Sequence, residues 1–154
     1  MTGIATIPIA KFMLAAAVSA AVVLEDIRHR RISNVLCAVL FISGALSSAL
    51  CRGWSGLADG VLGAAVGFIV LLVPYGLGGL GGGDVKLMCG FGALTGLRDI
   101  VPALILVSVA GAVTSGLYLL CSRLRGHIPP AAIPYAPAVA AGNLLVLFSQ
   151  VGAR

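Results

Sequence analysis

Long apolar runs separated by short polar breaks dominate the chain. Five of these runs are nearly free of charge, and each is close to the roughly 20 residues that a helix needs to cross a bilayer. They cover residues 5–24, 35–51, 57–77, 100–121 and 133–151. A sixth run, residues 85–97, is shorter and contains glycines that permit close packing against neighbouring helices. The pattern predicts an all-α fold, a polytopic membrane helix bundle of about six transmembrane segments.

The composition agrees with a membrane protein. Of the 154 residues, 60% are hydrophobic and only 10% are charged, and the mean hydropathy is +1.11. Soluble domains carry about 25% charged residues, and so few charges cannot cover a surface that faces water. The length leaves no room for a separate soluble domain, so we expect one membrane-embedded domain over residues 1–154.

The charges and the cysteines exclude several kinds of site. The net charge of +5 does not indicate nucleic-acid binding, because basic residues of membrane proteins gather in cytoplasmic loops and set the topology. The four cysteines stand singly in or beside apolar runs, without a CxxC pair, which favours buried thiols over a metal or redox site. We therefore expect no metal and no cofactor. The first apolar run lacks the basic start of a signal peptide, and we interpret it as a retained span.

Positive charge divides unevenly between the two ends of the expected bundle. With six alternating segments, one end carries Arg28, Arg30, Arg31, Lys86, Arg123 and Arg125, and the other carries Lys11, Arg52, Arg98 and Arg154. The richer end is expected to be cytoplasmic. This orientation places Asp26 and Asp84 at the same, cytoplasmic face of the membrane.

The chain has only five acids: Glu25, Asp26, Asp59, Asp84 and Asp99. Asp59 and Asp99 lie near short connections, where we expect them to be solvated or to cap helix N-termini. Asp26 leaves the first apolar run directly, in "VVLEDIRHRRISN". It is either a functional acid or a loop acid that pairs with Arg28 or Arg30. In the same stretch, Ser33 or Asn34 is expected to cap the second span.

The stretch "GGLGGGDVK", residues 78–86, places an acid behind a run of glycines between two apolar segments. Glycines weaken a helix, and non-helical backbone at membrane depth must be covered by protein or by a water-filled cavity. We therefore expect a break in the helix and a wet pocket at Asp84, since ionisable residues at this depth usually mark functional sites. The alternative is an interfacial turn in which Lys86 offsets the charge. The spacing excludes a phosphate-binding GxxxxGK[ST] loop.

Two carboxylates at one face favour acid–base chemistry on water. When two carboxyls lie close together, their mutual repulsion raises one pKa, so one group holds a proton while the other is ionised. The ionised group can take a proton from an attacking water, and the protonated group can polarise a carbonyl. Asp26 and Asp84 are the candidates for this pair.

Three stretches of the chain resemble the type IV prepilin peptidases, which are membrane aspartyl proteases of the GxGD type. These are "DIRHRRISN" (26–34), "GGGDVKLMCGFGALTG" (81–96) and "IPYAPAVAAG" (133–142). The resemblance implies that Asp26 and Asp84 are catalytic. It also implies that the supporting residues are Arg28, Asn34, Gly81, Gly82, Gly83 and Lys86, with Ile32 matching the first motif. Members of this family remove the leader of prepilins or pseudopilins at the cytoplasmic face of the inner membrane, which agrees with the orientation expected from the cations.

The chain also departs from the larger members of that family. Those carry an N-terminal cytoplasmic domain with paired cysteines and methylate the new N-terminus, so we do not expect the methyltransferase activity here. The short form is similar to the peptidases of tight-adherence (Flp-type) pilus systems. A different class of function remains open, a small proton- or ion-coupled membrane transporter that uses Asp84 as its relay acid. A third alternative is a non-catalytic assembly protein with the same fold.

Overall fold

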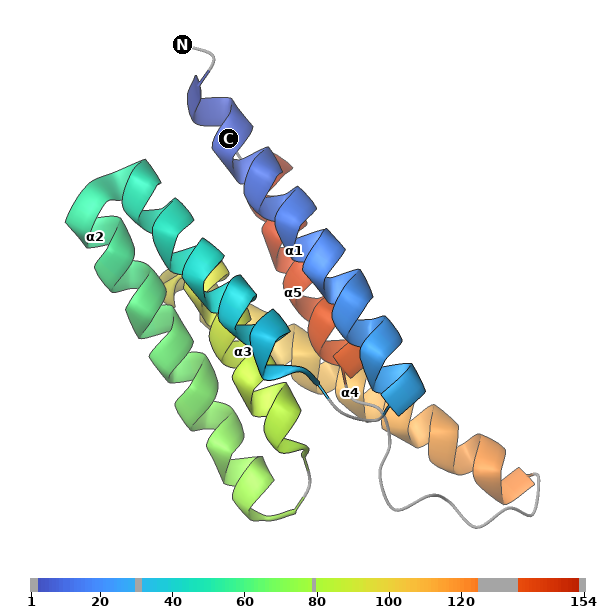
Figure 1. Ribbon diagram of the computed structural model, residues 1–154. Coiled ribbons are helices and arrows are strands. Elements are labelled where there is room, and N and C mark those ends of the chain that lie inside the picture. The colour runs from blue at the N-terminus through green and yellow to red at the C-terminus, as the bar shows by residue number, and fades with distance from the viewer. Residues whose placement is uncertain (1–2, 30–31, 79, 125–135, 153–154) are drawn as a thin grey trace.

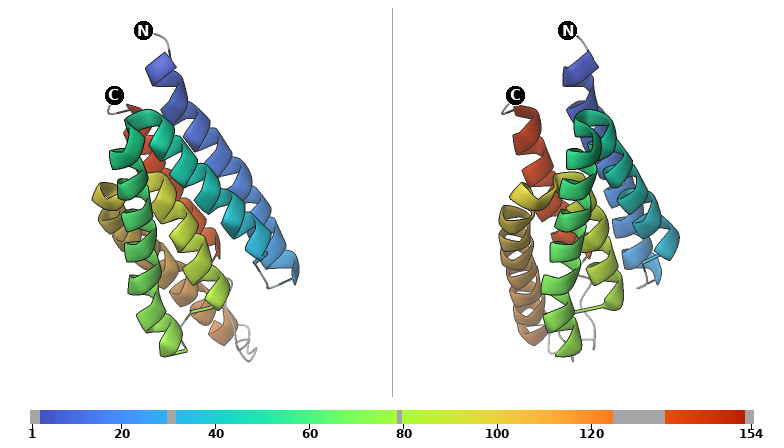
Figure 2. Two further views of the ribbon diagram at one scale, coloured as in Figure 1. Left: turned by 60° about the vertical axis from the view of Figure 1, so that its left-hand side comes forward. Right: turned by 90° about the vertical axis from the view of Figure 1, so that its left-hand side faces the viewer.

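The computed structural model describes residues 3–29, 32–78, 80–124 and 136–152, and these ranges form helices without a strand. The helices are α1 (Gly3–His29), α2 (Asn34–Gly76), α3 (Gly82–Thr95), α4 (Leu97–Leu124) and α5 (Ala136–Gly152). The expected all-α class is confirmed. Figures 1 and 2 show an elongated bundle in which α1 begins and α5 ends at the same end.

Helix α2 is a helical hairpin. It covers 43 residues, but Gly53 interrupts it with φ +60° and ψ −142°. An L-residue with a side chain rarely adopts a positive φ, whereas glycine does so without steric cost. Figure 1 shows the two halves, residues 34–52 and 54–76, running side by side in opposite directions. These halves correspond closely to the expected separate runs 35–51 and 57–77.

Glycines allow α3 to pack closely against both halves of α2. A Cβ on Gly44, in the first half, would lie 2.7 Å from the backbone nitrogen of Leu94. In the second half, a Cβ on Gly63 would lie 2.4 Å from the carbonyl oxygen of Gly92, and the reverse distance is also 2.4 Å. The two backbones therefore touch directly, as expected for glycines at a helix–helix contact.

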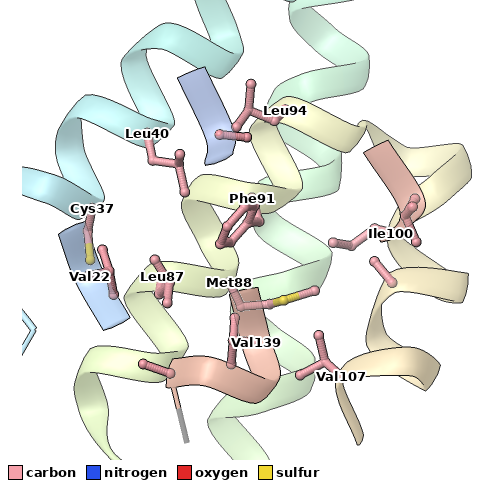
Figure 3. Packing of buried hydrophobic residues seen from close by; sticks show 14 of the residues in the cluster. Val22, Cys37, Leu40, Leu87, Met88, Phe91, Leu94, Ile100, Val107 and Val139 are labelled. Atoms are coloured by element: carbon pink, nitrogen blue, oxygen red, sulfur yellow. The ribbon is translucent and has the colours of Figure 1, made fainter. Parts of the chain in front are cut away.

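The hydrophobic core joins α3 to the other helices. Figure 3 shows Phe91 and Met88 of α3 in its middle, with Leu40 of α2, Ile100 of α4 and Val139 of α5 around them. All five side chains are inaccessible to solvent. Helix α3, the shortest of the five, is therefore the central element against which the others pack.

The outer surface is apolar, as expected for contact with lipid. Leu50, Trp54 and Leu124 are 73%, 87% and 78% exposed. By length and composition, two described segments are able to cross a membrane, namely Asn34–Gly76 and Leu97–Leu117. These findings are consistent with a membrane protein, and the number of about six spans stays a prediction.

An electrostatic clamp holds the end of the bundle where α2 reverses. Arg52 forms an ion pair with Asp59 in the second half of α2. The other oxygen of Asp59, Oδ1, accepts the N–H of Leu97 at 3.1 Å and thus satisfies a free donor at the start of α4. The capping role expected for Asp59 is confirmed, although the capped helix is α4 rather than its own.

The cations divide between the two ends as expected within the described ranges. Arg28 and Arg123 lie in the last turns of α1 and α4, at the end opposite to Arg52. Lys86 lies near the start of α3, at the same end as Arg28. Arg30, Arg31, Arg125 and Arg154 lie outside the described residues.

Candidate functional site

The two candidate carboxyls lie at the end of the bundle opposite to the reversal of α2. Asp26 belongs to the last turn of α1, and Asp84 to the first turn of α3. Both are buried, with 8% and 7% of their surface exposed. The charge of Asp26 is close enough to raise the pKa of Asp84. Folding thus brings together two acids from distant parts of the chain.

Asp84 stabilises the start of its own helix. Gly81 is the N-cap of α3, and its N–H donates a hydrogen bond to the Asp84 carboxylate. A carboxylate in the first turn that reaches back to the N-cap N–H is half of a capping box. The expectation of non-helical backbone up to Asp84 is therefore wrong for residues 82–84. The irregular segment ends at Gly81, because this hydrogen bond and the surrounding packing offset the low helix propensity of glycine.

The glycines before Asp84 differ in the space that they leave. A Cβ on Gly81 would lie 3.1 Å from Asp84 Oδ2, and a Cβ on Gly83 would lie 3.0 Å from the Cβ of Ile32. On Gly82, by contrast, the nearest atom would be a ring carbon of Tyr75 at 3.4 Å, which is an ordinary contact. Of the three glycines, only Gly81 and Gly83 would bring a Cβ so close that a neighbouring side chain must shift by a few tenths of an ångström. Sequence reasoning missed Tyr75, since nothing local connects it to the glycines.

Asp26 faces the start of α5. It accepts a hydrogen bond from the backbone N–H of Ala136, the first residue of α5, while its Oδ2 is buried and has no hydrogen-bond partner. The alternative in which Asp26 pairs with Arg28 is wrong within the described part of the chain, because Arg28 is exposed and forms no described ion pair with it. Arg30 lies outside that part.

The segments around the two acids interlock. The Ile32 side chain occupies the space above Gly83, and Lys86 Nζ donates to Asn34 Oδ1 at 2.9 Å. Of the expected supporting residues, Asn34 and Lys86 thus contact each other, and Gly83 lies against Ile32. Arg28 does not join them in the described contacts.

Two hydrogen bonds at Ser33 hold the connection between α1 and α2 in place. The Ser33 side chain accepts the N–H of Val35 at 3.2 Å and is the N-cap of α2, which confirms the expected capping role. Glu25 Oε2 accepts the Ser33 N–H at 3.0 Å. The residue next to Asp26 therefore fixes the start of α2 against the end of α1.

The partner of Asp26 on α5 was not anticipated from the sequence. The stretch "IPYAPAVAAG" contains Ala136 and is rich in proline, and proline is favoured in the first turn of a helix. The expected last span, residues 133–151, overlaps α5, which begins at Ala136. A hydrogen bond to a backbone N–H leaves no mark in the side-chain pattern, so the contact with Asp26 required the structure.

Both carboxyls lie outside the segments that are able to cross the membrane. Neither belongs to α2 or α4, and Asp26 follows the expected span 5–24. Burial and then the charge of Asp26 raise the pKa of Asp84 to about 6, against a smaller opposing effect of the Gly81 N–H. Burial also raises the pKa of Asp26, and the Ala136 N–H opposes it. The pair therefore takes up one proton at about pH 6, well above the usual range of a carboxyl.

The described residues contain no group of three or more His, Cys, Asp or Glu side chains placed to hold a metal ion. Cys37, Cys51, Cys89 and Cys121 are free thiols. The chemistry that this site offers is that of two carboxyls, a lysine–asparagine contact and two helix N-termini.

Comparison with known proteins relates both acid-bearing segments to one family. A sequence model of the type IV leader peptidase family matches residues 13–116. A prepilin leader peptidase/N-methyltransferase from Bacillus subtilis (strain 168) is 39% identical over 88 residues, which are 56% of this chain and 34% of that protein. A protein of the same name from Xanthomonas campestris pv. campestris is 30% identical over 130 residues, 80% of this chain and 44% of that protein.

A third relative of the same name, from Pseudomonas putida, is 39% identical over 105 residues, 63% of this chain and 35% of that protein. The chain thus spans less than half the length of these relatives. No solved structure is a significant match. Asp26 and Asp84 both lie within the residues that the family model matches.

Proposed function

The chain belongs to the type IV leader peptidase family, and we propose that it is an intramembrane aspartyl endopeptidase that removes the leader peptide of type IV prepilins or pseudopilins. The observation that carries this proposal is the pairing of two buried carboxyls, Asp26 and Asp84, from segments that interlock at one end of the bundle. Such a pair supplies both the base and the acid that peptide hydrolysis by water needs.

In this mechanism Asp84 holds the proton and Asp26 is ionised. Burial and the charge of Asp26 together raise the pKa of Asp84 to about 6, whereas burial alone raises the pKa of Asp26 and the Ala136 N–H opposes it. The free Oδ2 of Asp26 accepts a proton from water as the water oxygen attacks the scissile carbonyl. Asp84 donates its proton toward the carbonyl oxygen, and no covalent intermediate with the enzyme forms.

The tetrahedral intermediate then breaks its carbon–nitrogen bond. The new amine takes up the proton that Asp26 received from water, and the carbonyl re-forms as the carbonyl oxygen returns its proton to Asp84. Both carboxyls thereby recover their starting states. The proposal covers peptide hydrolysis only, since two carboxyls do not by themselves form a site for a methyl donor.

We place the site at the cytoplasmic face of the inner membrane. Arg28, Lys86 and Arg123 lie at the same end of the bundle as the carboxyls, and basic residues favour the cytoplasmic side. The apolar pilin helix then remains in the bilayer while its leader reaches the carboxyl pair at the interface. Expected partners are the prepilin and the lipid bilayer.

Co-expression of the chain with a candidate prepilin tests the proposal. The expected result is a leader-free pilin, seen as a faster band on a gel and as a mass decrease equal to that of the leader. If the chain removes the leader from none of the prepilins that are encoded beside its gene, the proposal is contradicted. If Asp84→Asn instead changes only the flux of protons or ions across the membrane of vesicles that contain the protein, the transporter alternative replaces the peptidase proposal.

Gly83→Ala is expected to slow cleavage by about tenfold to a hundredfold, because a displaced reacting group costs rates of this size. The new Cβ would meet Ile32 atoms at 3.0–3.1 Å, so either Ile32 or the start of α3 must shift, and Asp84 follows directly in the chain. Cleavage by purified protein in detergent measures the effect.

Gly82→Ala is the matched control for that change. The nearest atoms to its Cβ would be those of the Tyr75 side chain, at 3.4–3.6 Å, which are ordinary contacts, so we expect a much smaller loss of rate. Adding Ile32→Ala to Gly83→Ala removes two of the three crowding atoms and should recover part of the activity. Equal losses for both glycines would show that Ile32 does not control the position of Asp84.

A further inference from the structure

Three buried side-chain atoms of the described residues lack a hydrogen-bond partner, namely Ser19 Oγ, Asp26 Oδ2 and Asn143 Oδ1. Asp26 Oδ2 belongs to the carboxyl pair. The other two lie in the apolar part of the bundle, where Ser19 is 3% exposed and Asn143 is fully buried. An unpaired polar atom in such surroundings is costly. These two therefore need an explanation that the carboxyl pair does not supply.

The packing of α1 against α5 places Ser19 and Asn143 at the same level. The two helices lie side by side and run in opposite directions (Figures 1 and 2). Near one end of their contact, the Phe12 and Phe148 rings lie 5.8 Å apart. At the other end, Asp26 accepts the N–H of Ala136.

Ser19 lies seven residues after Phe12 and seven before Asp26, so all three share one face of α1. Asn143 lies seven residues after Ala136 on α5, which corresponds to about 10 Å along the helix. Because the helices are antiparallel, a step of seven residues from the Asp26–Ala136 contact leads to Ser19 on one helix and to Asn143 on the other.

Asn143 also links α5 to α3. Its Nδ2 donates to Met88 Sδ at 3.3 Å and to the Val139 carbonyl oxygen at 2.9 Å. Met88 lies one turn after Asp84 on α3, and Figure 3 shows its side chain extending from α3 toward the part of α5 that carries Val139. Both donors of the amide are used, whereas its carbonyl oxygen is not.

We propose that Ser19 and Asn143 bind one buried water molecule between α1 and α5, and that this junction positions the carboxyl pair. A buried water needs two to four polar partners. Ser19 Oγ can donate or accept, and Asn143 Oδ1 accepts, so the water satisfies both free atoms. The positioning role rests on the proposed peptidase function.

The junction connects the three helices that build the site. Helix α1 carries Asp26, α5 carries the Ala136 N–H that Asp26 accepts, and α3 carries Asp84. Asn143 bonds to α3 through Met88 and, through the water, to α1 at Ser19. Sliding of α5 along α1 would break the water bridge and the bond to Asp26 together. Asn143 and Ser19 are thus positioning residues, and neither touches the substrate.

A thermal double-mutant cycle tests the water site without any assay of activity. Ser19→Ala is expected to lower the midpoint of thermal unfolding in detergent by several degrees, because it leaves Asn143 Oδ1 without its bridge. In an Asn143→Leu background, which removes that oxygen at similar volume, Ser19→Ala should cause no decrease. Equal shifts in both backgrounds, or no shift in the parent, would overturn the water site.

Kinetics test the positioning role. Asn143→Leu is expected to lower kcat by about tenfold with KM unchanged and without a lower unfolding midpoint. Ser149→Ala is the control, because its hydroxyl bonds to the Val146 carbonyl oxygen of its own helix at 2.7 Å and should leave kcat and the midpoint as they are. A parent-like kcat in Asn143→Leu overturns the positioning role. A parent chain that cleaves no prepilin overturns the peptidase function and this role with it, while the thermal cycle still decides the water site.

Discussion

Asp84→Asn is expected to lower the rate of leader cleavage by about a thousandfold or more, since one positioned acid or base contributes on the order of 10²–10⁴-fold. The amide keeps the size of the side chain but can neither hold nor release the proton. Asp26→Asn should cause a similar loss, because the two groups act as a unit. The measurement is the amount of leader-free pilin after co-expression, followed by rates with purified protein.

Asp59→Asn is the matched control for these two variants. It changes the same chemical group at the far end of the bundle, where Asp59 pairs with Arg52 and caps α4. We expect a loss of about 1 kcal/mol of stability and unchanged cleavage. If Asp84→Asn or Asp26→Asn is folded and membrane-inserted yet cleaves like the parent, the two-carboxyl mechanism is excluded.

The same Asp84→Asn variant should gain stability at neutral pH. The pKa of Asp84 is about 6 in the folded protein and about 4 in an unfolded chain, so folding binds a proton between these values. The folded state therefore becomes less stable as pH rises from about 4 to about 6, by roughly 2–3 kcal/mol at pH 7 and above. Asparagine removes this loss. Thermal midpoints should favour the variant at pH 8 and show no such gain at pH 4.

Gly92→Ala is expected to have the largest effect on folding. Its Cβ would lie 2.4 Å from the carbonyl oxygen of Gly63 and 2.8 Å from the Cα of Ala64, and backbone atoms cannot rotate away as a side chain can. The second half of α2 and α3 must separate, which we expect to cost roughly 3 kcal/mol or more. The thermal midpoint and the folded yield in detergent should both fall, and cleavage should fall with them because α3 carries Asp84.

Gly116→Ala is the control for that substitution. Gly116 lies within α4, and a Cβ there would meet no atom within 4 Å. Alanine is a better helix former than glycine by up to about 1 kcal/mol, so this variant should match or exceed the parent in stability. A Gly92→Ala protein as stable as the Gly116→Ala protein would contradict direct backbone contact between α2 and α3.

The positions of the helices followed from local pattern. The apolar runs 35–51 and 57–77 correspond to the two halves of α2, and the run 100–121 lies within α4. A run of apolar residues bounded by polar ones is a property of a short segment, and a membrane permits few structures for it. Counting alternating segments was then sufficient to place Asp26 and Asp84 at one end of the bundle.

The start of α3 shows where local reasoning failed. Three glycines in succession predicted irregular backbone up to Asp84, yet the helix begins at Gly82. Low helix propensity is a weak preference that tertiary contacts override. Here Ile32 packs on Gly83 and Tyr75 on Gly82, and both neighbours come from outside α3. No pattern within residues 78–86 contains that information.

From the sequence alone came the all-α class, the helix-forming runs, the two acids at one end and their resemblance to an enzyme family, because periodicity, composition and motif spacing are local properties of a chain. Folding settled which groups face each acid. Contacts between segments far apart in sequence produce the hydrogen bond from the Ala136 N–H to Asp26 and the packing of Ile32 on Gly83. They also place Ser19 and Asn143 at the same height along α1 and α5. Such contacts depend on how whole helices pack and slide against one another, and a one-dimensional pattern does not specify that register.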